Sequence, residues 1–281
     1  YLVLEADEWN KSFLEYMPHI AVVTNIDAEH LDTYGNAQGV ERAFREYLKK
    51  IPPKGAVVAN ADDAGVRRAL KNFKRRIVWY SLADAEASLL RPLLKAPGEH
   101  NVANAVAALK TARLLGVHDP SALHAIGNFH GAWRRFEFMG ARNNAFVFSD
   151  YGHHPTEIKA TLAAARSRFP FRRIWCVYQP HQYERLSHLW DDFTTAFDLA
   201  DRVVMLPVYA VAGRESRAFA RKVNAKKLVA ALTNRAKQAL YLSSRIEAQS
   251  YLSSHTRQGD VLLIMGAGDI YKTGIELLKD G

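Results

Sequence analysis

The feature that most constrains the fold is a regular alternation of short apolar segments and helical segments in the second half of the chain. Strands are expected at Ala145–Phe148, Arg173–Tyr178, Arg202–Leu206, Gln238–Leu242 and Asp260–Met265. Helices are expected at Thr156–Arg168, Ser187–Leu199, Ser216–Asn224, Ala225–Asn234, Ile246–Ser253 and Ile270–Leu278. Short apolar strands that alternate with helices indicate a parallel sheet covered on both faces. This half has the size of one Rossmann-like domain.

The first half shows the same α/β pattern less regularly. The expected strands are Ile20–Thr24, Ala56–Asn60 and Ile77–Tyr80, and the expected helices are Gly39–Lys50, Ala64–Phe73, His100–Leu115 and Ser121–Phe129. A polar stretch, Ala141–Asn144, separates the two patterns. We therefore predict two α/β domains with mostly parallel sheets, residues 1–142 and 143–281.

Composition excludes several classes of protein. The 281 residues carry a formal charge of +9, but basic pairs such as Arg172-Arg173 are scattered and form no stripe interleaved with aromatic residues, which argues against nucleic acid as the partner. No apolar run is long enough to span a membrane, and no secretory segment is present. Cys176 is the only cysteine, so no intrachain disulfide can form, and its apolar neighbours predict a buried, inert thiol. We expect a cytoplasmic protein.

Acidic residues follow two expected strands. The chain opens with YLVLEADE, in which Tyr1–Leu4 has strand-like composition and Glu5 begins an acidic cluster. The segment Thr24–Asp32 places His30 among acids just past the next strand. Carboxylates at strand ends can bind Mg²⁺, and if the two strands are neighbours, Glu5 and His30 could share one metal-bearing cleft. The alternative is a solvated acidic turn and a solvated loop histidine.

Two further motifs carry polar groups suited to a nucleotide. Asn101 and Asn104 are three residues apart at the start of an expected helix, where their amides could read the edge of a heterocycle. Alternatively, Asn101 could simply cap that helix. Arg134 and Arg135 follow a glycine and offer planar forks to phosphate or carboxylate, unless they form a surface ion pair with Glu137.

The most specific motif is DYGHHPTE, residues 150–157, which follows the first strand of the second domain and opens its first helix. Pro155 suits a first helical turn, and a helix N-terminus attracts an anion. YQPHQYER, residues 178–185, ends the next strand of the same sheet, so it should reach the same cleft. The glycines of GAGDI, residues 266–270, lack a full dinucleotide-binding fingerprint and do not predict an NAD site.

Together and in this order, these motifs resemble the Mur ligase family. They are EADE (Glu5–Glu8), TNIDAEHLD (Thr24–Asp32), APGEHNVANA (Ala96–Ala105), RRFEFMG (Arg134–Gly140), DYGHHPTE (Asp150–Glu157), YQPHQYER (Tyr178–Arg185) and GAGDI (Gly266–Ile270). Members have a UDP-sugar domain, a central P-loop ATP domain and a Rossmann-like C-terminal domain. The resemblance implies that this chain begins within the central domain, because it contains neither the UDP-sugar domain nor a GxxGK[ST] loop.

The resemblance also implies roles for individual residues. Glu5 and His30 would bind Mg²⁺. The expected ATP-binding residues are His100, Asn101, Asn104, Arg134, Arg135, Asp150 and Tyr151, and the expected catalytic and amino-acid-binding residues are His153, His181 and Arg185. Gln182 stands where many members have arginine, which removes one expected carboxylate contact.

The implied reaction is ATP-dependent amide formation in peptidoglycan precursor synthesis, in which L-alanine is added to UDP-N-acetylmuramate through an acyl phosphate. The chain alone, without the phosphate loop, would be inactive. One alternative within the family is a murein-peptide ligase, which joins a recycled tripeptide to the same sugar. The other is a non-catalytic nucleotide- or partner-binding module.

Overall fold

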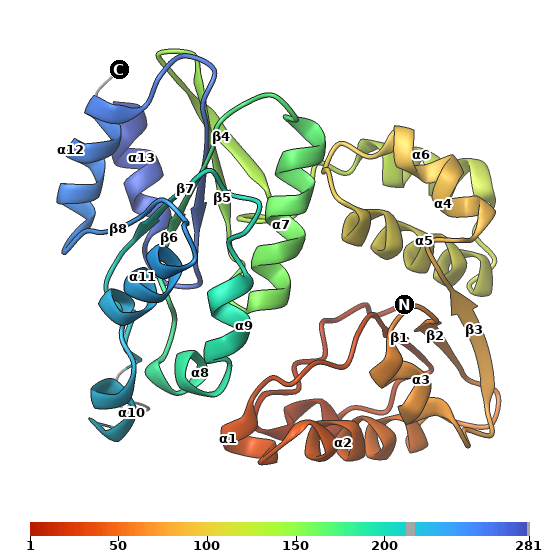
Figure 1. The fold of residues 1–281 in the computed structure, drawn as a ribbon. Coiled ribbons are helices and arrows are strands. Elements are labelled where there is room, and N and C mark those ends of the chain that lie inside the picture. Colours follow the sequence, from red (N-terminus) through yellow and green to blue (C-terminus); the bar gives the residue numbers. More distant parts are fainter. Residues whose placement is uncertain (212–216, 280–281) are drawn as a thin grey trace. The chain divides into compact units, whose positions relative to one another are not determined.

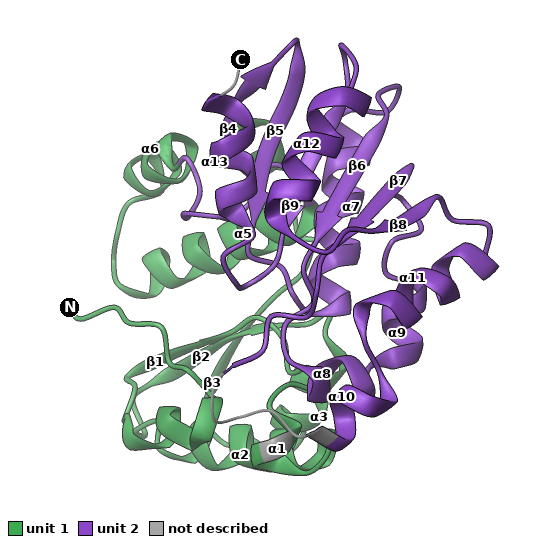
Figure 2. Ribbon diagram, turned by 90° about the vertical axis from the view of Figure 1, so that its left-hand side faces the viewer, with its two compact units in different colours: residues 1–95, 99–129 green, residues 96–98, 130–281 purple. Residues whose placement is uncertain are grey.

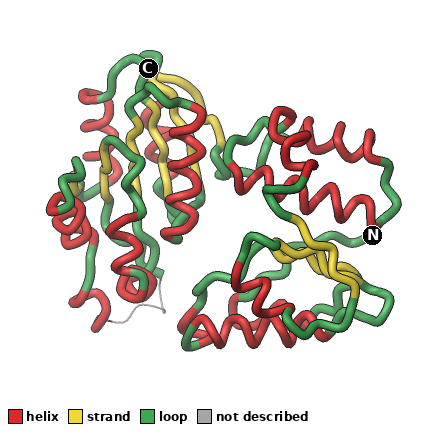
Figure 3. Tube along the Cα trace, turned by 45° about the vertical axis from the view of Figure 1, so that its right-hand side comes forward, coloured by secondary structure: helices red, strands yellow, loops and turns green. Residues whose placement is uncertain are grey.

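The computed structural model describes residues 1–211 and 217–279, which form two compact units. Unit 1 comprises Tyr1–Lys95 and Glu99–Phe129, and unit 2 comprises Ala96–Gly98 and His130–Gly281 (Figure 2). Each unit contains its own sheet, flanked by helices, as Figure 3 shows with strands in yellow and helices in red. The predicted α/β class with mostly parallel sheets is therefore confirmed.

Unit 1 is built on a parallel three-stranded sheet with the order β1-β2-β3. Its strands are β1 (Ile20–Val23), β2 (Ala56–Asn60) and β3 (Arg76–Tyr80), as predicted to within one residue at each end. Its helices are η1 (Trp9–Glu15), α1 (Leu31–Tyr34), α2 (Ala37–Lys49), α3 (Ala64–Leu70), α4 (Ala85–Leu90), η2 (Arg91–Leu93), α5 (Glu99–Leu114) and α6 (Asp119–Asn128). Among the described residues, β1 is an outermost strand, paired on one side only.

The faces of this sheet bury two separate apolar clusters. Val57 and Ala59 of β2 pack with α2, α3 and η1, whereas Val58, between them in sequence, packs with α4, α5 and α6. Successive side chains of a strand point to opposite faces, so a strand with both faces covered is apolar throughout. Asn36 and Asp63 begin α2 and α3 by accepting hydrogen bonds from backbone N–H groups of the first turn.

The expected strand at the start of the chain is absent from the structure. Tyr1–Leu4 forms no secondary structure, and the side chains of Tyr1, Leu2 and Val3 are 100%, 86% and 88% exposed. An apolar composition yields a strand only where a neighbouring strand supplies hydrogen-bond partners, and Tyr1–Leu4 has none among the described residues.

Unit 2 contains a six-stranded sheet with the order β4-β5-β9-β6-β7-β8, in which only β4 is antiparallel to its neighbour (Figure 2). Its strands are β4 (Glu137–Arg142), β5 (Ala145–Asp150), β6 (Ile174–Tyr178), β7 (Arg202–Met205), β8 (Ala239–Tyr241) and β9 (Val261–Met265). Its helices are α7 (Pro155–Arg168), α8 (Tyr183–His188), α9 (Trp190–Thr195), α10 (Arg217–Lys222), α11 (Ala225–Asn234), α12 (Arg245–His255) and α13 (Tyr271–Lys279). Helices α7 to α13 of this unit are labelled in Figure 1.

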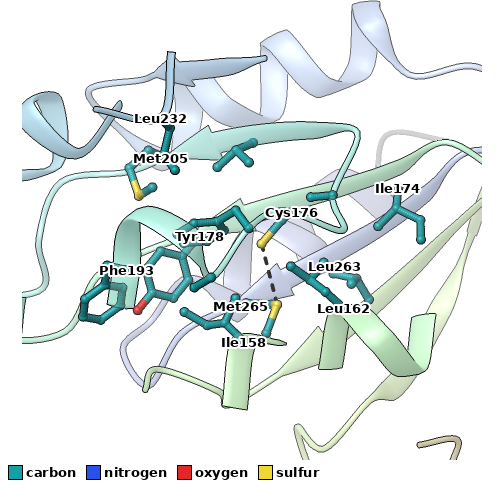
Figure 4. Close-up of a cluster of buried hydrophobic side chains, with 14 of the residues drawn as sticks. Ile158, Leu162, Ile174, Cys176, Tyr178, Phe193, Met205, Leu232, Leu263 and Met265 are labelled. Atoms are coloured by element: carbon teal, nitrogen blue, oxygen red, sulfur yellow. Dashed lines mark hydrogen bonds between the residues drawn. The ribbon is translucent and has the colours of Figure 1, made fainter. Parts of the chain in front are cut away.

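Helices cover both faces of the second sheet. One cluster joins the sheet to α7, α9 and α11 (Figure 4), and the other joins it to α12 and α13. Cys176 lies in the first cluster with its sulfur 3.7 Å from that of Met265, and burial raises the pKa of its thiol, so the predicted buried thiol is confirmed. No helix in the described part of the chain is long and apolar enough to cross a membrane.

Two sequence expectations for unit 2 differ from the structure. The chain divides at Phe129/His130 rather than after residue 142, because Glu137–Arg142 forms β4 and pairs with β5. The helix expected over Ser187–Leu199 is two short helices, α8 and α9, separated at Leu189. Of the helix expected from Ser216, residues from Arg217 onward form α10, while Ser216 lies outside the described residues.

Candidate active site at the carboxyl ends of the second sheet

The carboxyl ends of β5, β6 and β9 lie side by side in unit 2. Asp150 of β5 and Tyr178 of β6 both pair with Met265 of β9. The segments after these three strands therefore start at one level of the sheet, which is where open α/β sheets bind ligands. The motifs at 150–157 and 178–185 are brought together as the sequence predicted, and the motif at 266–270 starts at the same level.

The first turn of α7 is organised around the Glu157 carboxylate. Its Oε2 accepts hydrogen bonds from the backbone N–H groups of His153 (2.9 Å) and His154 (3.1 Å). In return, the His154 ring accepts one from the N–H of Thr156 (3.3 Å), which completes a capping box. Oε1 accepts from Arg135 Nη1 at 3.1 Å, and Oε2 lies 3.5 Å from His153 Nδ1. One carboxylate thus contacts two predicted site residues.

The protonation of Glu157 is coupled to these contacts. Burial alone would raise the pKa of its carboxyl, but the His153 ring, the two backbone N–H groups and Arg135 outweigh burial and lower the pKa from 4.5 to about 2. A folded-state pKa below the unfolded value means that the carboxylate stabilises the fold fully above about pH 4.5. That contribution is lost as the pH falls toward about 2.

We expect Glu157→Gln to lower the stability of unit 2 at neutral pH by about 1–2 kcal/mol, because the amide cannot replace the charged contacts with Arg135 and His153. The loss is no larger because the side chain is partly exposed and solvent screens its charge. The loss should shrink as the pH falls from about 4.5 toward 2, where the wild-type carboxylate is itself protonated. Urea denaturation across this range measures the effect. Glu184→Gln on α8 is the matched control, and an identical pH profile for wild type and Glu157→Gln would contradict the prediction.

Aromatic and imidazole rings line this end of the sheet. The His153 ring contacts the rings of Tyr151 (centroids 5.4 Å apart) and His181 (5.7 Å), and His181 stacks on Tyr209 (5.6 Å, 10° between planes). The Tyr178 hydroxyl donates to the backbone carbonyl of His153 at 3.0 Å. These contacts hold His153 and His181, from two different loops, next to each other.

Arg185 is a residue of α8 and lies beside His181, which precedes that helix. Its Nη1 is 3.2 Å from His181 Nδ1 and 3.4 Å from the His181 carbonyl oxygen. Gln182, between them, has φ of +67° and donates its backbone N–H to the carbonyl of Tyr209 at 3.1 Å. The tight turn at Gln182 therefore directs Arg185 back toward His181, which groups the three predicted catalytic residues.

Arg134 and Arg135 have different surroundings. Arg134 is buried; it donates from Nη2 to the carbonyl of Gly266 and lies against the rings of Tyr151 (5.0 Å) and Tyr271 (4.7 Å). Burial lowers its pKa, although a guanidinium still remains charged. Arg135 is on the surface and pairs with Glu157 rather than with Glu137. Arg134 thus ties two loops together, whereas Arg135 is exposed and paired with a carboxylate.

Asp150 supports the backbone of this region. Its Oδ1 accepts from the N–H of Gly152 at 2.7 Å and its Oδ2 from the N–H of Phe136 at 2.9 Å. Burial raises the pKa of this carboxyl, which the two backbone hydrogen bonds partly offset. Both oxygens are therefore engaged in shaping the turn that presents Tyr151 and His153.

In unit 1, two carboxylates other than that of Glu5 lie near His30. His30 Nε2 lies 3.8 Å from Glu8 Oε1 and 3.9 Å from Glu29 Oε2, whereas Glu5 is exposed in the extended segment. Burial raises the pKa of Glu8, although its backbone hydrogen bond and His30 act to lower it. Among residues 1–211 and 217–279, no group of three or more His, Cys, Asp or Glu side chains is arranged to hold a metal ion.

The predicted adenine-facing residues lie on the first turns of α5. This helix begins at Glu99, which forms a two-pronged ion pair with Arg91 (2.9 and 2.7 Å), so Asn101 lies inside the helix rather than at its cap. His100 and Asn104 are exposed and Asn101 is half-buried. Their contact with a nucleotide stays a prediction.

Two residues of the site were not assigned from sequence. Glu157 lies in the motif at 150–157, and its position three residues after His154 is the spacing of a capping box, which is the signal for its role. The signal for Tyr209 is its place shortly after the carboxyl end of β7, where it pairs with His181 of the loop that follows β6.

Two family models and several known proteins are similar to this chain. The family model for the Mur ligase middle domain matches residues 1–112, and the model for the Mur ligase glutamate ligase domain matches residues 134–268. UDP-N-acetylmuramate–L-alanine ligase from Clostridium acetobutylicum is 36% identical over 98% of this chain, and the protein of that name from Caldanaerobacter subterraneus is 35% identical over 100%. The chain spans 64% and 65% of their lengths.

Solved structures show the same fold. The UDP-N-acetylmuramate–alanine ligase of Thermotoga maritima superposes with a TM-score of 0.73 at 24% identity, over 96% of this chain and 61% of that one. A murein peptide ligase from Psychrobacter arcticus superposes with a TM-score of 0.62 at 22% identity, over 95% and 58%.

Proposed function

This chain belongs to the Mur ligase family, and we propose that it forms the middle and C-terminal parts of an ATP-dependent ligase that adds L-alanine to UDP-N-acetylmuramate in the cytoplasm. The observation that carries the proposal is 35–36% identity, over 98–100% of the chain, to proteins named for that reaction. The grouping of His153, His181 and Arg185 at the carboxyl ends of the second sheet supports it.

The proposed reaction has two steps. An oxygen of the lactyl carboxylate attacks the γ-phosphorus of ATP, and ADP leaves. The amine of L-alanine then attacks the acyl carbon of the resulting acyl phosphate, inorganic phosphate leaves, and the nitrogen loses a proton. Phosphoryl transfer depends mainly on positioning and charge neutralisation, so charged side chains should matter more than any nucleophilic one.

In this reaction, Arg185 receives the carboxylate of L-alanine through charge-assisted hydrogen bonds. His153 and His181 lie next to it, toward the reacting carbonyl, and their rings help to exclude water from the acyl phosphate. Arg135 faces the phosphates, and Glu157 positions both Arg135 and His153. In unit 1, the first turns of α5 with His100, Asn101 and Asn104 face the adenine.

The reaction implies Mg²⁺, which would neutralise charge on the phosphates. The carboxylate oxygens of Glu8 and Glu29 are the kind of donor that Mg²⁺ prefers, whereas the nitrogen of His30 is a less usual ligand for this ion. His30 and Glu5 remain our predicted ligands, and Glu8 is a further candidate because it is the carboxylate that lies nearer His30.

The test is an acceptor comparison with the full-length product of the gene that encodes this chain. Phosphate release from ATP with UDP-N-acetylmuramate is measured with L-alanine and, separately, with the murein tripeptide. We expect turnover with L-alanine and none above background with the tripeptide. The substitution His118→Ala, on the surface of unit 1, serves as the control that leaves turnover unchanged. Turnover with the tripeptide alone identifies a murein-peptide ligase, and turnover with neither favours a binding module.

A further inference from the structure

Tyr209 joins two of the loops that follow strands of the unit 2 sheet. It lies shortly after β7, and its backbone N–H donates to the carbonyl of Pro180 at 2.7 Å. Its own carbonyl accepts a hydrogen bond from the N–H of Gln182 at 3.1 Å. His181, between these two residues, forms a parallel bridge with Tyr209. The loops after β6 and β7 therefore remain paired at the level of the predicted site residues.

The side chain of Tyr209 contacts both a site residue and the loop after β9. Its ring stacks on the His181 imidazole, with centroids 5.6 Å apart and 10° between the planes. It also packs on Gly268, where an added Cβ would lie 2.5 Å from Tyr209 Cδ2, so this close approach requires glycine. Tyr209 is 38% exposed, so burial in the core does not explain why its ring is held in this way.

His181 is the ring through which Tyr209 reaches the rest of the site. Arg185 Nη1 lies 3.2 Å from His181 Nδ1, and the His153 ring centroid lies 5.7 Å from that of His181. An arginine N–H can only donate, so Nδ1 accepts and the neutral His181 ring carries its proton on Nε2. The hydrogen bond forms only while the imidazole is turned toward the guanidinium. The χ2 torsion of a histidine is soft, and a parallel aromatic neighbour restricts it.

We propose that Tyr209 is a positioning residue of the amino-acid site. By stacking on His181, it fixes the plane of the imidazole and, through the hydrogen bond to Nδ1, the Arg185 guanidinium that receives the carboxylate of the amino acid. The inference rests on the proposed function. In this scheme Tyr209 acts through His181 rather than on a reacting group, and the aromatic ring alone suffices, without the hydroxyl.

The first experiment is steady-state kinetics on the full-length product of the gene that encodes this chain, with each substrate varied in turn. We expect Tyr209→Ala to raise the KM for L-alanine at least about fivefold, and at most about a hundredfold, which is the cost of misplacing a group by about 1 Å. The KM for ATP should not change. Tyr209→Phe keeps the stacking ring and should behave as the wild type does.

Tyr251→Ala is the matched control, because Tyr251 also stacks on a histidine: its ring centroid lies 3.9 Å from that of His255, and both residues belong to α12. This variant loses a tyrosine–histidine stack of the same kind and should leave both KM values unchanged. Gly268→Ala should raise the KM for L-alanine as Tyr209→Ala does, since the added methyl group displaces the Tyr209 ring. Combining these two substitutions should add little, because the displaced ring is already absent.

A second readout needs no turnover and uses this chain as it is. The ring current of Tyr209 should shift the NMR signals of the His181 ring protons in a sample with labelled histidine. This shift should persist in Tyr209→Phe and disappear in Tyr209→Ala. His181→Ala identifies the signals, and circular dichroism verifies that each variant is folded.

The outcomes separate this inference from the proposed function. If the wild type turns over L-alanine and Tyr209→Ala has the same KM as Tyr251→Ala, the inference is overturned and the proposed function stands. Equal His181 signals in wild type and Tyr209→Ala also overturn the inference, with or without turnover. If the wild type turns over only the murein tripeptide, the proposed function is wrong, and a raised KM for the tripeptide in Tyr209→Ala still supports the positioning role. Turnover with neither acceptor overturns both.

Discussion

Asp260→Ala is expected to lower the free energy of unfolding of unit 2 by about 3–5 kcal/mol, because it leaves a partly buried guanidinium without its partner. Asp260 is only 3% exposed and accepts four hydrogen bonds. The donors are Arg173 Nε and Nη2, Trp175 Nε1 (3.0 Å) and the backbone N–H of Arg257 (2.8 Å). Burial alone would raise the pKa of this carboxyl, but these donors lower it overall, so the interaction is present at neutral pH.

The measurement is urea denaturation, monitored by amide hydrogen exchange in β6 and β9 so that the result reports on unit 2. Asp198→Ala is the control: this side chain is 57% exposed and 3.5 Å from Arg235, so its removal should change stability by less than about 1 kcal/mol. Asp260→Asn keeps the shape and one acceptor oxygen and should fall between the two. An Asp260→Ala variant as stable as the control would show that Arg173 finds another partner or water.

Arg185→Ala is expected to raise the KM for L-alanine by about ten- to a hundredfold with a smaller change in kcat. This expectation rests on the proposed function. A charge-assisted hydrogen bond to a carboxylate contributes about 1.5–3 kcal/mol, and each 1.4 kcal/mol is about a factor of ten. The effect should be confined to the amino acid because Arg185 contacts His181, whereas the proposed phosphate-facing Arg135 pairs with Glu157.

Steady-state kinetics with each substrate varied in turn, on the full-length gene product, measures this effect. Arg185→Lys keeps the charge without the fork, so it should recover only part of the affinity. Glu184→Ala, at the preceding position of α8, is the matched control and should leave the KM for L-alanine unchanged. If Arg185→Ala instead raised the KM for ATP alone, the assignment of Arg185 to the amino acid would be wrong.

Most elements of both sheets could be predicted from sequence because their strands are short, apolar and separated by helices. β4 was not predicted because its sequence lacks a regular alternation of apolar and polar residues. Gly140, with φ of +148°, lies at a register shift that interrupts this alternation. Tyr1–Leu4 was wrongly predicted as a strand because composition cannot reveal whether a pairing partner exists. Both errors concern pairing, which is a property of the assembled sheet.

The convergence of the unit 2 motifs could be predicted from sequence, for a physical reason. In a parallel sheet, strand ends bring their following loops together, so motifs at 150–157 and 178–185 had to converge. Near His30 the geometry depends on the left-handed conformation of His30 itself, whose φ is +52°, and on the Tyr34 hydroxyl, which donates to the backbone carbonyl of Glu8. No local rule predicts which nearby acid will reach His30.

The single-sided pairing of β1 has a consequence for handling the protein. Its four residues, Ile20–Val23, are uncharged and apolar, and Val22 is 46% exposed. An uncovered apolar strand offers a row of unpaired N–H and C=O groups to another chain, which makes it a template for aggregation. In unit 2 the outermost strands are blunted: β8 has only three residues, and β4 carries Glu137 and Arg142 at its ends. On heating or concentration, intermolecular association should therefore begin at β1.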